Sequence, residues 1–284
     1  MIERWIFTVT AGRSGQATLS ALLERHVEGV YTAFEEPRVS PILPGFFGDL
    51  ERRFRRRFVE THELLGRGKV LEAYASGDDA YIDRIVARRL RMIERAMARR
   101  GASIYVDISK YFARGLHRGF ARALPAFSLI RLVRDPLLNM RSFLNRDKNF
   151  HLDNPMPDAP NNILRMNFSG LEKGELYLWV WCEMYLRFDQ LVDDYGVDRA
   201  VEIRTEDFND AVRMEAHFAA LGLDHTRVQV EAAMNTNVDQ GRPGTSVSAE
   251  DVALFERFFA RLPAEVRRRI RYFDDYDPYR RHAA

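Results

Sequence analysis

The sequence predicts an α/β protein in which helices cover a central parallel sheet, and three observations support this fold class. Short apolar runs rich in Ile, Val and Phe alternate with longer stretches of helical periodicity, as in parallel sheets whose strands are joined by helices. A chain of 284 residues is long enough to bury one sizeable core. It contains no internal repeat and no low-complexity linker. We therefore expect a single domain spanning residues 1–284.

Five of the short apolar runs are predicted to be strands. In chain order they are Trp5–Thr10, Val30–Phe34, Ser103–Ile108, Phe127–Val133 and Ala200–Ile203. Four longer stretches repeat apolar residues every three or four positions and are predicted to be helices. They are Ala17–His26, Ala80–Arg100, Leu137–Arg146 and Glu175–Tyr195. Beyond Asp210 we expect mostly helix, with a break at Gly241–Gly244.

Two stretches differ from this scaffold pattern. Residues 37–75 contain prolines and the basic run Arg52–Arg57, and residues 147–174 contain prolines and asparagines with little periodicity. Long loops inside a compact domain are commonly lids or binding segments. We expect both stretches to be insertions on the substrate side of the domain.

The composition narrows the class of protein. Hydrophobic residues make up 46% of the chain and charged residues 30%, as in ordinary soluble globular proteins. The net charge of +2 is too small for a polyanion-binding protein on charge alone. Only four of the cations are lysines. The planar fork of arginine suits phosphate and sulfate, although a genomic codon bias would also favour arginine.

The sequence also lacks signs of secretion, a membrane span or a metal centre. Cys182 is the only cysteine, so no intrachain disulfide can form. No leader-like segment opens the chain, and no apolar run approaches the roughly 20 residues of a membrane span. The seven histidines are scattered and do not match metal-ligand spacing. We therefore expect a soluble, cytoplasmic protein without a metal site.

The first predicted strand, the turn after it and the following helix form a candidate phosphate cradle. Backbone N–H groups in such a turn can point at an anion, and the helix start adds a positive dipole end. The turn lacks the lysine of the ATP-binding pattern Gly-x-x-x-x-Gly-Lys-Ser/Thr, which disfavours a nucleoside triphosphatase or a small-molecule kinase. The cradle residues are Gly12, Arg13, Ser14, Gly15, Gln16, Ala17 and Thr18.

A second candidate anion site follows the predicted strand Phe127–Val133. Arg134 lies at the strand end, and Asp135 can cap the helix that Pro136 opens. Ser142 lies eight residues after Arg134 on that helix, so both side chains can converge on one phosphate. The alternative is a helix cap beside a surface arginine.

Together these motifs resemble the superfamily of sulfotransferases that use 3′-phosphoadenosine 5′-phosphosulfate (PAPS), and in particular its carbohydrate and Golgi-type branch and bacterial relatives. The resemblance rests on four short motifs in the family's order, over roughly residues 5–210. They are Gly12-Arg13-Ser14-Gly15, Phe34-Glu35-Glu36-Pro37, Leu132-Val133-Arg134-Asp135-Pro136 with Ser142, and Ile203–Phe208. The implied fold is the sulfotransferase fold, a P-loop-like α/β domain.

The resemblance also implies roles for individual residues. In the family the first loop holds the 5′-phosphosulfate, and Arg134 and Ser142 match the pair that holds the 3′-phosphate. Arg13 would face the transferring sulfuryl group. Glu36, with Glu35 as its competitor, would be the general base for the acceptor hydroxyl. The implied reaction is in-line transfer of a sulfuryl group from PAPS to a small-molecule, carbohydrate or lipid acceptor, without a metal.

The chain departs from the family at two places. Gln16 and Ala17 stand where the family usually has serine or threonine, so one hydroxyl contact is lost or moves to Thr18. The glycine-rich, lysine-containing C-terminal loop of the cytosolic branch is missing, and Arg242 in the segment Gly241–Gly244 is the candidate to replace it. A second interpretation is therefore a catalytically inactive protein that still binds PAPS or its product.

A third interpretation is a nucleic-acid-binding module built on the basic run Arg52–Arg57. Such modules place aromatic stacking residues beside a basic stripe, and only Phe54 and Phe58 flank this run. The run also suits an exposed helix face or contact with an acidic acceptor. We expect no nucleic-acid partner.

Several other residues have both a structural and a functional interpretation. Arg38 could orient the acceptor or the sulfate. Asp107 and Lys110 follow a strand at the carboxyl edge of the sheet, where α/β proteins bind ligands, but they could equally cap the next helix. Glu206 and Asp207 are expected to hold the donor-side loops through hydrogen bonds. Three aromatic residues on one predicted helix are expected in the core: Trp179, Trp181 and Phe188.

Overall fold

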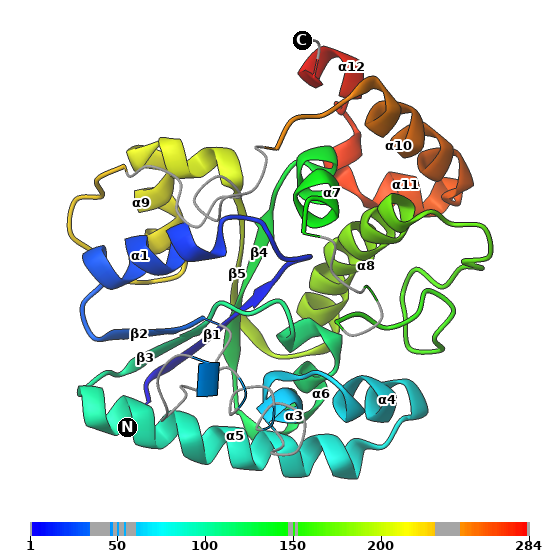
Figure 1. Ribbon diagram of the computed structural model, residues 1–284. Coiled ribbons are helices and arrows are strands. Elements are labelled where there is room, and N and C mark those ends of the chain that lie inside the picture. Colours follow the sequence, from blue (N-terminus) through cyan, green and yellow to red (C-terminus); the bar gives the residue numbers. More distant parts are fainter. Residues whose placement is uncertain are drawn as a thin grey trace.

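The structure is a computed structural model that describes residues 2–34, 46–47, 50, 54, 61–146, 150, 153–230 and 245–282. In this part of the chain five strands form one parallel sheet, ordered β2-β3-β1-β4-β5 (Figure 1). The strands are β1 (Arg4–Val9), β2 (Val30–Ala33), β3 (Ile104–Asp107), β4 (Phe127–Val133) and β5 (Val197–Arg204). The sheet confirms the predicted α/β class.

Helices cover both faces of this sheet. One face carries α1 (Gln16–His26) and α9 (Ala211–Ala220), and the other carries α5 (Asp79–Arg100), α6 (Leu116–Ala123) and α8 (Lys173–Asp194). The remaining helices are shorter or lie at the sides. They are α3 (Thr61–Leu65), α4 (Lys69–Ser76), α7 (Pro136–Leu144), α10 (Ala249–Arg261), α11 (Ala264–Arg269) and α12 (Pro278–His282), with 3₁₀ turns η1 (Phe112–Arg114), η3 (Thr205–Asn209) and η5 (Arg271–Phe273).

Strand alternation divides the interior into two cores. Neighbouring residues of a strand point to opposite faces, so Ile6 and Ile130 join the core under α1 and α9, while Phe7 and Leu129 join the larger core under α5, α6 and α8. In the larger core the Phe7 ring stacks on Phe112 at 4.2 Å between centroids. The central strands β1 and β4 are buried on both faces, as strands of parallel sheets are, whereas the edge strand β5 is partly exposed.

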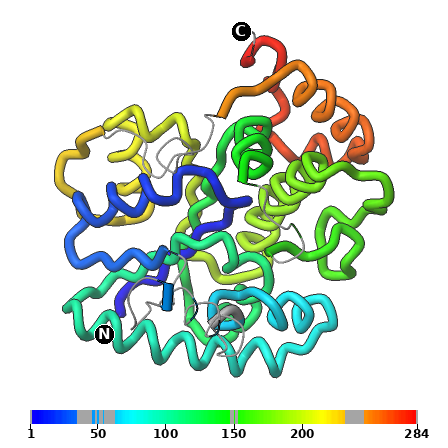
Figure 2. The backbone as a smooth tube through the Cα atoms, in the orientation of Figure 1, coloured from blue at the N-terminus to red at the C-terminus, as the bar shows by residue number. Residues whose placement is uncertain are grey.

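All five strands end at the same edge of the sheet. After β1 the chain builds β2 and β3 on one side of it, and then crosses to build β4 and β5 on the other side, as Figure 2 allows the reader to trace by colour. Ligands of open α/β sheets bind outside the carboxyl ends of the strands, near such a change of direction. The turns after β1, β3, β4 and β5 therefore meet where a ligand is expected.

The predicted strands and helices are confirmed, with differences at their ends. β4 occupies the predicted range, whereas β5 begins three residues earlier than predicted, at Val197. Most of α4 lies within the stretch 37–75, and it buries Val70 and Tyr74 in the larger core. Helix α6 was not predicted. The break expected at Gly241–Gly244 lies outside the described residues.

Between residue 153 and the start of α8, the stretch 147–174 contains no helix or strand. Trp179, Trp181 and Phe188 are buried in the larger core, which confirms their expected packing role. The C-terminal helices lie against α7 and α8, where Arg141 pairs with Asp251 of α10. None of the described helices has the length and apolar character needed to cross a bilayer. The cytoplasmic location and the extent of the domain stay predictions.

Candidate functional site

The turn after β1 has the backbone of a phosphate cradle. Gly12, Arg13 and Gly15 have φ values of 94°, 60° and 81°, and Arg13 is the one non-glycine residue with positive φ in the described part of the chain. A left-handed conformation costs a side-chain-bearing residue free energy and is often retained at ligand sites. Gly15 then forms the N-cap of α1.

Close packing explains the two glycines of this turn. A Cβ atom on Gly15 would lie 2.3 Å from Cε2 of Phe208, and a Cβ atom on Gly12 would lie 2.9 Å from Cδ of Lys110. Phe208 ends the Ile203–Phe208 motif, and Lys110 follows β3. The turns after β1, β3 and β5 are therefore in contact through positions that admit only glycine.

Side chains from other elements hold the cradle from outside. Nδ2 of Asn139, on α7, donates to the Gly12 carbonyl at 2.7 Å and to Oγ of Ser14 at 3.2 Å. Nη2 of Arg114 donates to the Ala11 carbonyl at 2.9 Å. Both long side chains are buried. Sequence reasoning missed Asn139 and Arg114; Asn139 lies one helical turn before Ser142, on the same face of α7, and this spacing could have indicated it.

The N-terminus of α1 presents N–H groups without a side-chain cap. The first N–H groups of any helix lack intrahelical partners, and no described side chain accepts a capping hydrogen bond here. One donor of the turn is taken internally, because the Arg13 N–H donates to Oε1 of Gln16 at 3.2 Å. Nε2 of Gln16 in turn donates to the Ile108 carbonyl at 3.1 Å. Gln16 thus shapes the turn, and an anion would be met by the N–H groups that follow.

The structure brings together the three side-chain anchors expected for the donor. Nε of Arg13 donates to Oγ of Ser142 at 3.2 Å, and Nη1 of Arg134 donates to the Arg13 carbonyl at 3.2 Å. Arg13 therefore lies between Arg134 and Ser142. Asp135 caps α7 by accepting from the N–H groups of Leu137 and Leu138, both at 3.0 Å, as predicted.

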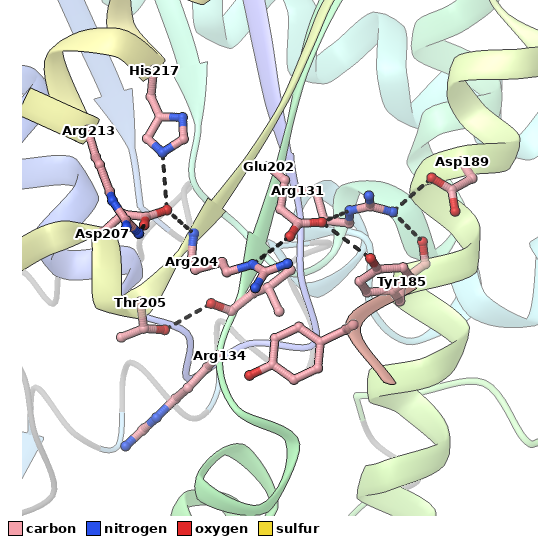
Figure 3. A network of polar contacts seen from close by, with 12 residues as sticks. Arg131, Arg134, Tyr185, Asp189, Glu202, Arg204, Thr205, Asp207, Arg213 and His217 are labelled. Carbon is pink, nitrogen blue, oxygen red and sulfur yellow. Dashed lines mark hydrogen bonds and ion pairs between the residues drawn. The ribbon is translucent and has the colours of Figure 1, made fainter. Parts of the chain in front are cut away.

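Arg134 is a partly buried cation with few partners. Burial lowers the pKa of its guanidinium, although Asp135 and Glu206 oppose this shift. Within the described residues its side chain forms no ion pair and makes a single hydrogen bond, to the Arg13 carbonyl. Nε1 of Trp181 donates to the Arg134 carbonyl at 2.8 Å and fixes its backbone. In Figure 3 the Arg134 side chain extends away from the neighbouring ion-pair network.

That neighbouring network surrounds Arg131, on β4 (Figure 3). Its guanidinium pairs with Asp189 at 2.8 Å and with Glu202 at 2.9 Å. It also lies over the ring of Tyr185, with 4.0 Å from Cζ to the centroid. Glu202 pairs in addition with Arg204 at 2.8 Å. The network links β4, β5 and α8 and gives Arg131 two carboxylate partners.

The segment after β5 is held by Asp207. Its carboxylate accepts from the Arg204 N–H at 2.9 Å and contacts Arg213 and His217, each at 3.1 Å. Burial raises the pKa of Asp207, but these hydrogen bonds outweigh it and the pKa is lowered. Thr205 donates to the Val133 carbonyl at 3.0 Å and so joins this segment to β4. Asp207 has the structural role that the sequence predicts.

Asp107 and Lys110 do not cap the next helix. Asp107 is fully buried, pairs with Arg89 of α5 and accepts from the Ser109 N–H at 3.0 Å. The N-caps of η1 and α6 are other residues, Tyr111 and Gly115. The capping alternative is therefore wrong for both residues.

Lys110 instead belongs to a buried cluster around Asp153. Oδ2 of Asp153 lies 2.8 Å from Nζ of Lys110, and Oδ1 lies 2.6 Å from Nη2 of Arg67. Nη1 of Arg114 donates to the Asp153 carbonyl at 2.6 Å. Burial raises the pKa of Asp153, but Lys110 and Arg67 outweigh it and hold the pKa far below its ordinary value. The cluster ties the segment before α8 to the cradle.

Several predicted site residues lie outside the described residues. The base candidates Glu36 and Glu35 are among them, together with Arg38, Arg242 and all the arginines of the Arg52–Arg57 run. In the described part of the chain no group of three or more His, Cys, Asp or Glu side chains is placed to hold a metal ion.

Comparisons with known proteins complete the description. No family model matches the chain, and no curated protein matches it significantly. Among solved structures it is similar to the sulfotransferase domain of the olefin synthase of Synechococcus PCC 7002, with a TM-score of 0.49 and 16% sequence identity. That alignment covers 98% of this chain and 96% of the other.

Proposed function

We propose that this chain is a sulfotransferase that moves a sulfuryl group from PAPS to a hydroxyl group of a small-molecule, carbohydrate or lipid acceptor. Support comes from the four motifs shared with that superfamily and from the arrangement of the first and third of them. The uncapped N-terminus of α1 and the group Arg13, Arg134 and Ser142 meet at the carboxyl edge of the sheet. This edge is where an α/β protein binds its ligand.

The main observation behind the proposal is that the partly buried Arg134 guanidinium has few partners. An arginine has five N–H donors, and burying a cation without an anionic partner costs free energy. Arg134 is partly buried, yet within the described residues its side chain has a single partner, the Arg13 carbonyl. A phosphate ester at this position would accept several of the remaining donors in charge-assisted hydrogen bonds. The 3′-phosphate of PAPS is such a group.

The proposed chemistry needs positioning and charge stabilisation more than covalent catalysis. The N–H groups at the start of α1 would hold the 5′-phosphosulfate, with Thr18 as the candidate hydroxyl contact. Arg134 and Ser142 would hold the 3′-phosphate, and Arg242 is a further candidate for donor binding. Arg13 would neutralise charge that develops on the transferring group. Removing one such preorganised partner commonly raises the barrier by roughly 3 to 4 kcal/mol.

Glu36 is the proposed general base. Pro37 restricts the backbone before it to extended geometry, which limits where the Glu36 carboxylate can go. The Glu36→Gln variant should bind product nucleotide normally but turn over about 10² to 10⁴ times more slowly. Glu35→Gln is the matched control and should retain most activity, because adjacent side chains of extended chain point in opposite directions. If Glu35→Gln is the inactive variant, the assignment is shifted by one residue.

The direct test is turnover with PAPS and a panel of hydroxylated acceptors, followed by mass spectrometry of the sulfated product. We expect transfer to persist after EDTA treatment, because arginine and backbone donors meet the charge of PAPS. Tight product binding without transfer to any acceptor would favour the inactive binding protein that Gln16 and Ala17 suggest. Failure to bind PAPS or its product would overturn the proposal.

A further inference from the structure

A second polar cleft lies away from the cradle. It has a volume of about 560 Å³ and is formed by α4, α6, residues 160–163, the C-terminal half of α8 and the end of α11. None of the cradle residues, nor Arg134 or Ser142, lines it. The proposed transfer reaction therefore gives this cleft no role.

Cations outnumber carboxylates in the lining. Arg118, Arg187 and Arg269 line the cleft, against one carboxylate, Asp194. Arg187 and Arg118 have carboxylate partners just outside the lining, since Arg187 lies 2.6 Å from Glu183 and Arg118 lies 2.7 Å from Asp79. Arg269 is the lining arginine that has no ion pair within the described residues. Burial lowers the pKa of His117, and the charges of Arg187 and Arg118 lower it further, so this histidine adds no charge near neutral pH.

The floor of the cleft also holds a polar atom without a hydrogen-bond partner. Arg187 is only 3% exposed. Its terminal nitrogens donate to Gln190, Asn161 and Glu183, but its buried Nε forms no hydrogen bond with a described atom. Native proteins rarely leave buried polar atoms unpaired, and such exceptions call for a partner. The unpaired Arg187 N–H is a donor, so the missing partner is an acceptor.

The rim adds two exposed charges. Arg269 is an exposed residue of α11, and it forms no ion pair within the described residues. Asp194, at the end of α8, is exposed as well. An incoming anion would be attracted by the first side chain and repelled by the second. The two positions can therefore be used to test the charge of a ligand without disturbing the core.

We propose that this cleft is a second binding site, for a small anion that carries a phosphate, sulfate or carboxylate group. Arg187 offers a buried donor for its oxygen atoms, and Arg269 offers an exposed cation at the mouth. Arginine binds all three groups through charge-assisted hydrogen bonds. The site does not depend on the proposed sulfotransferase activity, and a ligand here would contact the same segment that Asp153 joins to the cradle.

Calorimetry with inorganic phosphate and with citrate, at constant ionic strength, tests the proposal. Product nucleotide is added first at saturation to occupy the cradle, and the titrations are repeated in Arg134→Ala without it. Arg269→Gln should weaken binding roughly tenfold, as expected for loss of one charged contact. Arg268→Gln, a neighbouring exposed arginine that does not line the cleft, is the control and should change nothing.

A second pair of variants tests the sign of the effect. Asp194→Asn should tighten anion binding several-fold, whereas Asp193→Asn, outside the lining, should not. Binding of only one of the two probes would identify the preferred group. If neither probe binds, or if the paired variants behave alike, the site does not exist as proposed. A chain that binds anions here but fails to transfer sulfate would overturn the proposed function and leave this inference intact.

Discussion

Arg131 and Arg134 lie three residues apart in the sequence, yet their guanidinium groups have opposite surroundings (Figure 3). Arg131 pairs with Asp189 and Glu202 and lies over the Tyr185 ring. Arg134 has one carbonyl as its side-chain partner within the described residues, and burial depresses its pKa. This difference between the two arginines is the basis of the proposed 3′-phosphate site at Arg134.

The helix N-termini differ in whether a side chain caps them. Asp135 caps α7, Asp210 caps α9 and Ser248 caps α10 with their side chains. Helix α1 has no side-chain cap and no acidic residue in its first turn. Caps stabilise a helix by about 1 kcal/mol. Helices α4, α6 and α11 also lack a side-chain cap, and α1 differs from them in lying beside Arg13, Arg134 and Ser142. The number of protein partners likewise distinguishes Arg131 from Arg134, and substitutions can test this difference.

The largest expected effect is a loss of stability in the buried cluster around Asp153. Asp153→Asn removes the anion that Lys110 and Arg67 share, in a place where Asp153 is only 6% exposed. Breaking a buried pair leaves uncompensated charge and should lower the free energy of unfolding by about 3 to 5 kcal/mol. Asp158→Asn, an exposed residue of the same segment, is the control. Urea unfolding at pH 7 measures both variants.

The pH dependence of this loss has a defined sign. The pKa of Asp153 is depressed in the folded state, so its contribution is present above the unfolded pKa of about 3.9 and is lost as pH falls through the folded value. The difference between parent and Asp153→Asn should therefore be constant near neutrality and shrink only below about pH 4. A difference that fades between pH 8 and 6 would mean that another group controls the cluster.

The next largest expected effect is a loss of nucleotide affinity when Arg134 is replaced. Arg134→Ala should weaken binding of the 3′-phosphorylated product nucleotide by about one to two orders of magnitude, as expected for charged hydrogen bonds. Its 3′-dephospho analogue should bind the parent and the variant almost equally. Calorimetry with both ligands measures the difference. Equal losses for the two nucleotides would remove Arg134 from the 3′-phosphate site.

The sequence predicted the local parts of this architecture. The strand Phe127–Val133 and the start of α7 were readable, because an apolar run and an Asp-Pro cap act on their own neighbours. Helix α6 was not, because it has only eight residues and contains Gly119, which is unfavourable inside a helix. That glycine is required by close packing on α5, since a Cβ atom there would lie 2.6 Å from Val86. Contacts between distant elements thus decided what local periodicity could not.

In the candidate site, too, the sequence indicated residues of one local motif and missed residues with distant partners. Arg134 and Ser142 were found because they occupy one strand–helix unit. Asn139 and Asp153 were missed, because each acts on a partner far away in the sequence: Asn139 on Gly12, and Asp153 on Lys110. No spacing within a local motif encodes such pairs. The base assignment at Glu36 remains a prediction, since that residue lies outside the described part of the chain.

A smaller effect is expected at Arg131. Arg131→Met removes the partner of Asp189 and Glu202, which are themselves partly exposed, and it also removes the contact with the Tyr185 ring. The loss of stability should be about 1 to 2 kcal/mol, because exposure of the carboxylates limits each pair. Product-nucleotide affinity of the folded protein should be unchanged. A large loss of affinity would show that the network contributes to donor binding.

The smallest effect is the most diagnostic one. Without ligand, Arg134→Met should change the free energy of unfolding by less than about 0.5 kcal/mol, because the side chain gives up one hydrogen bond and sheds a desolvated charge. With product nucleotide at about 100 times its dissociation constant, the parent should gain about 2.7 kcal/mol. The variant, at the same nucleotide concentration, should gain much less. Thermal unfolding of the parent and of Arg134→Met, with and without nucleotide, measures these differences in stability. If the variant were strongly destabilised without ligand, Arg134 would be a structural arginine like Arg131, and the contrast between them would fail.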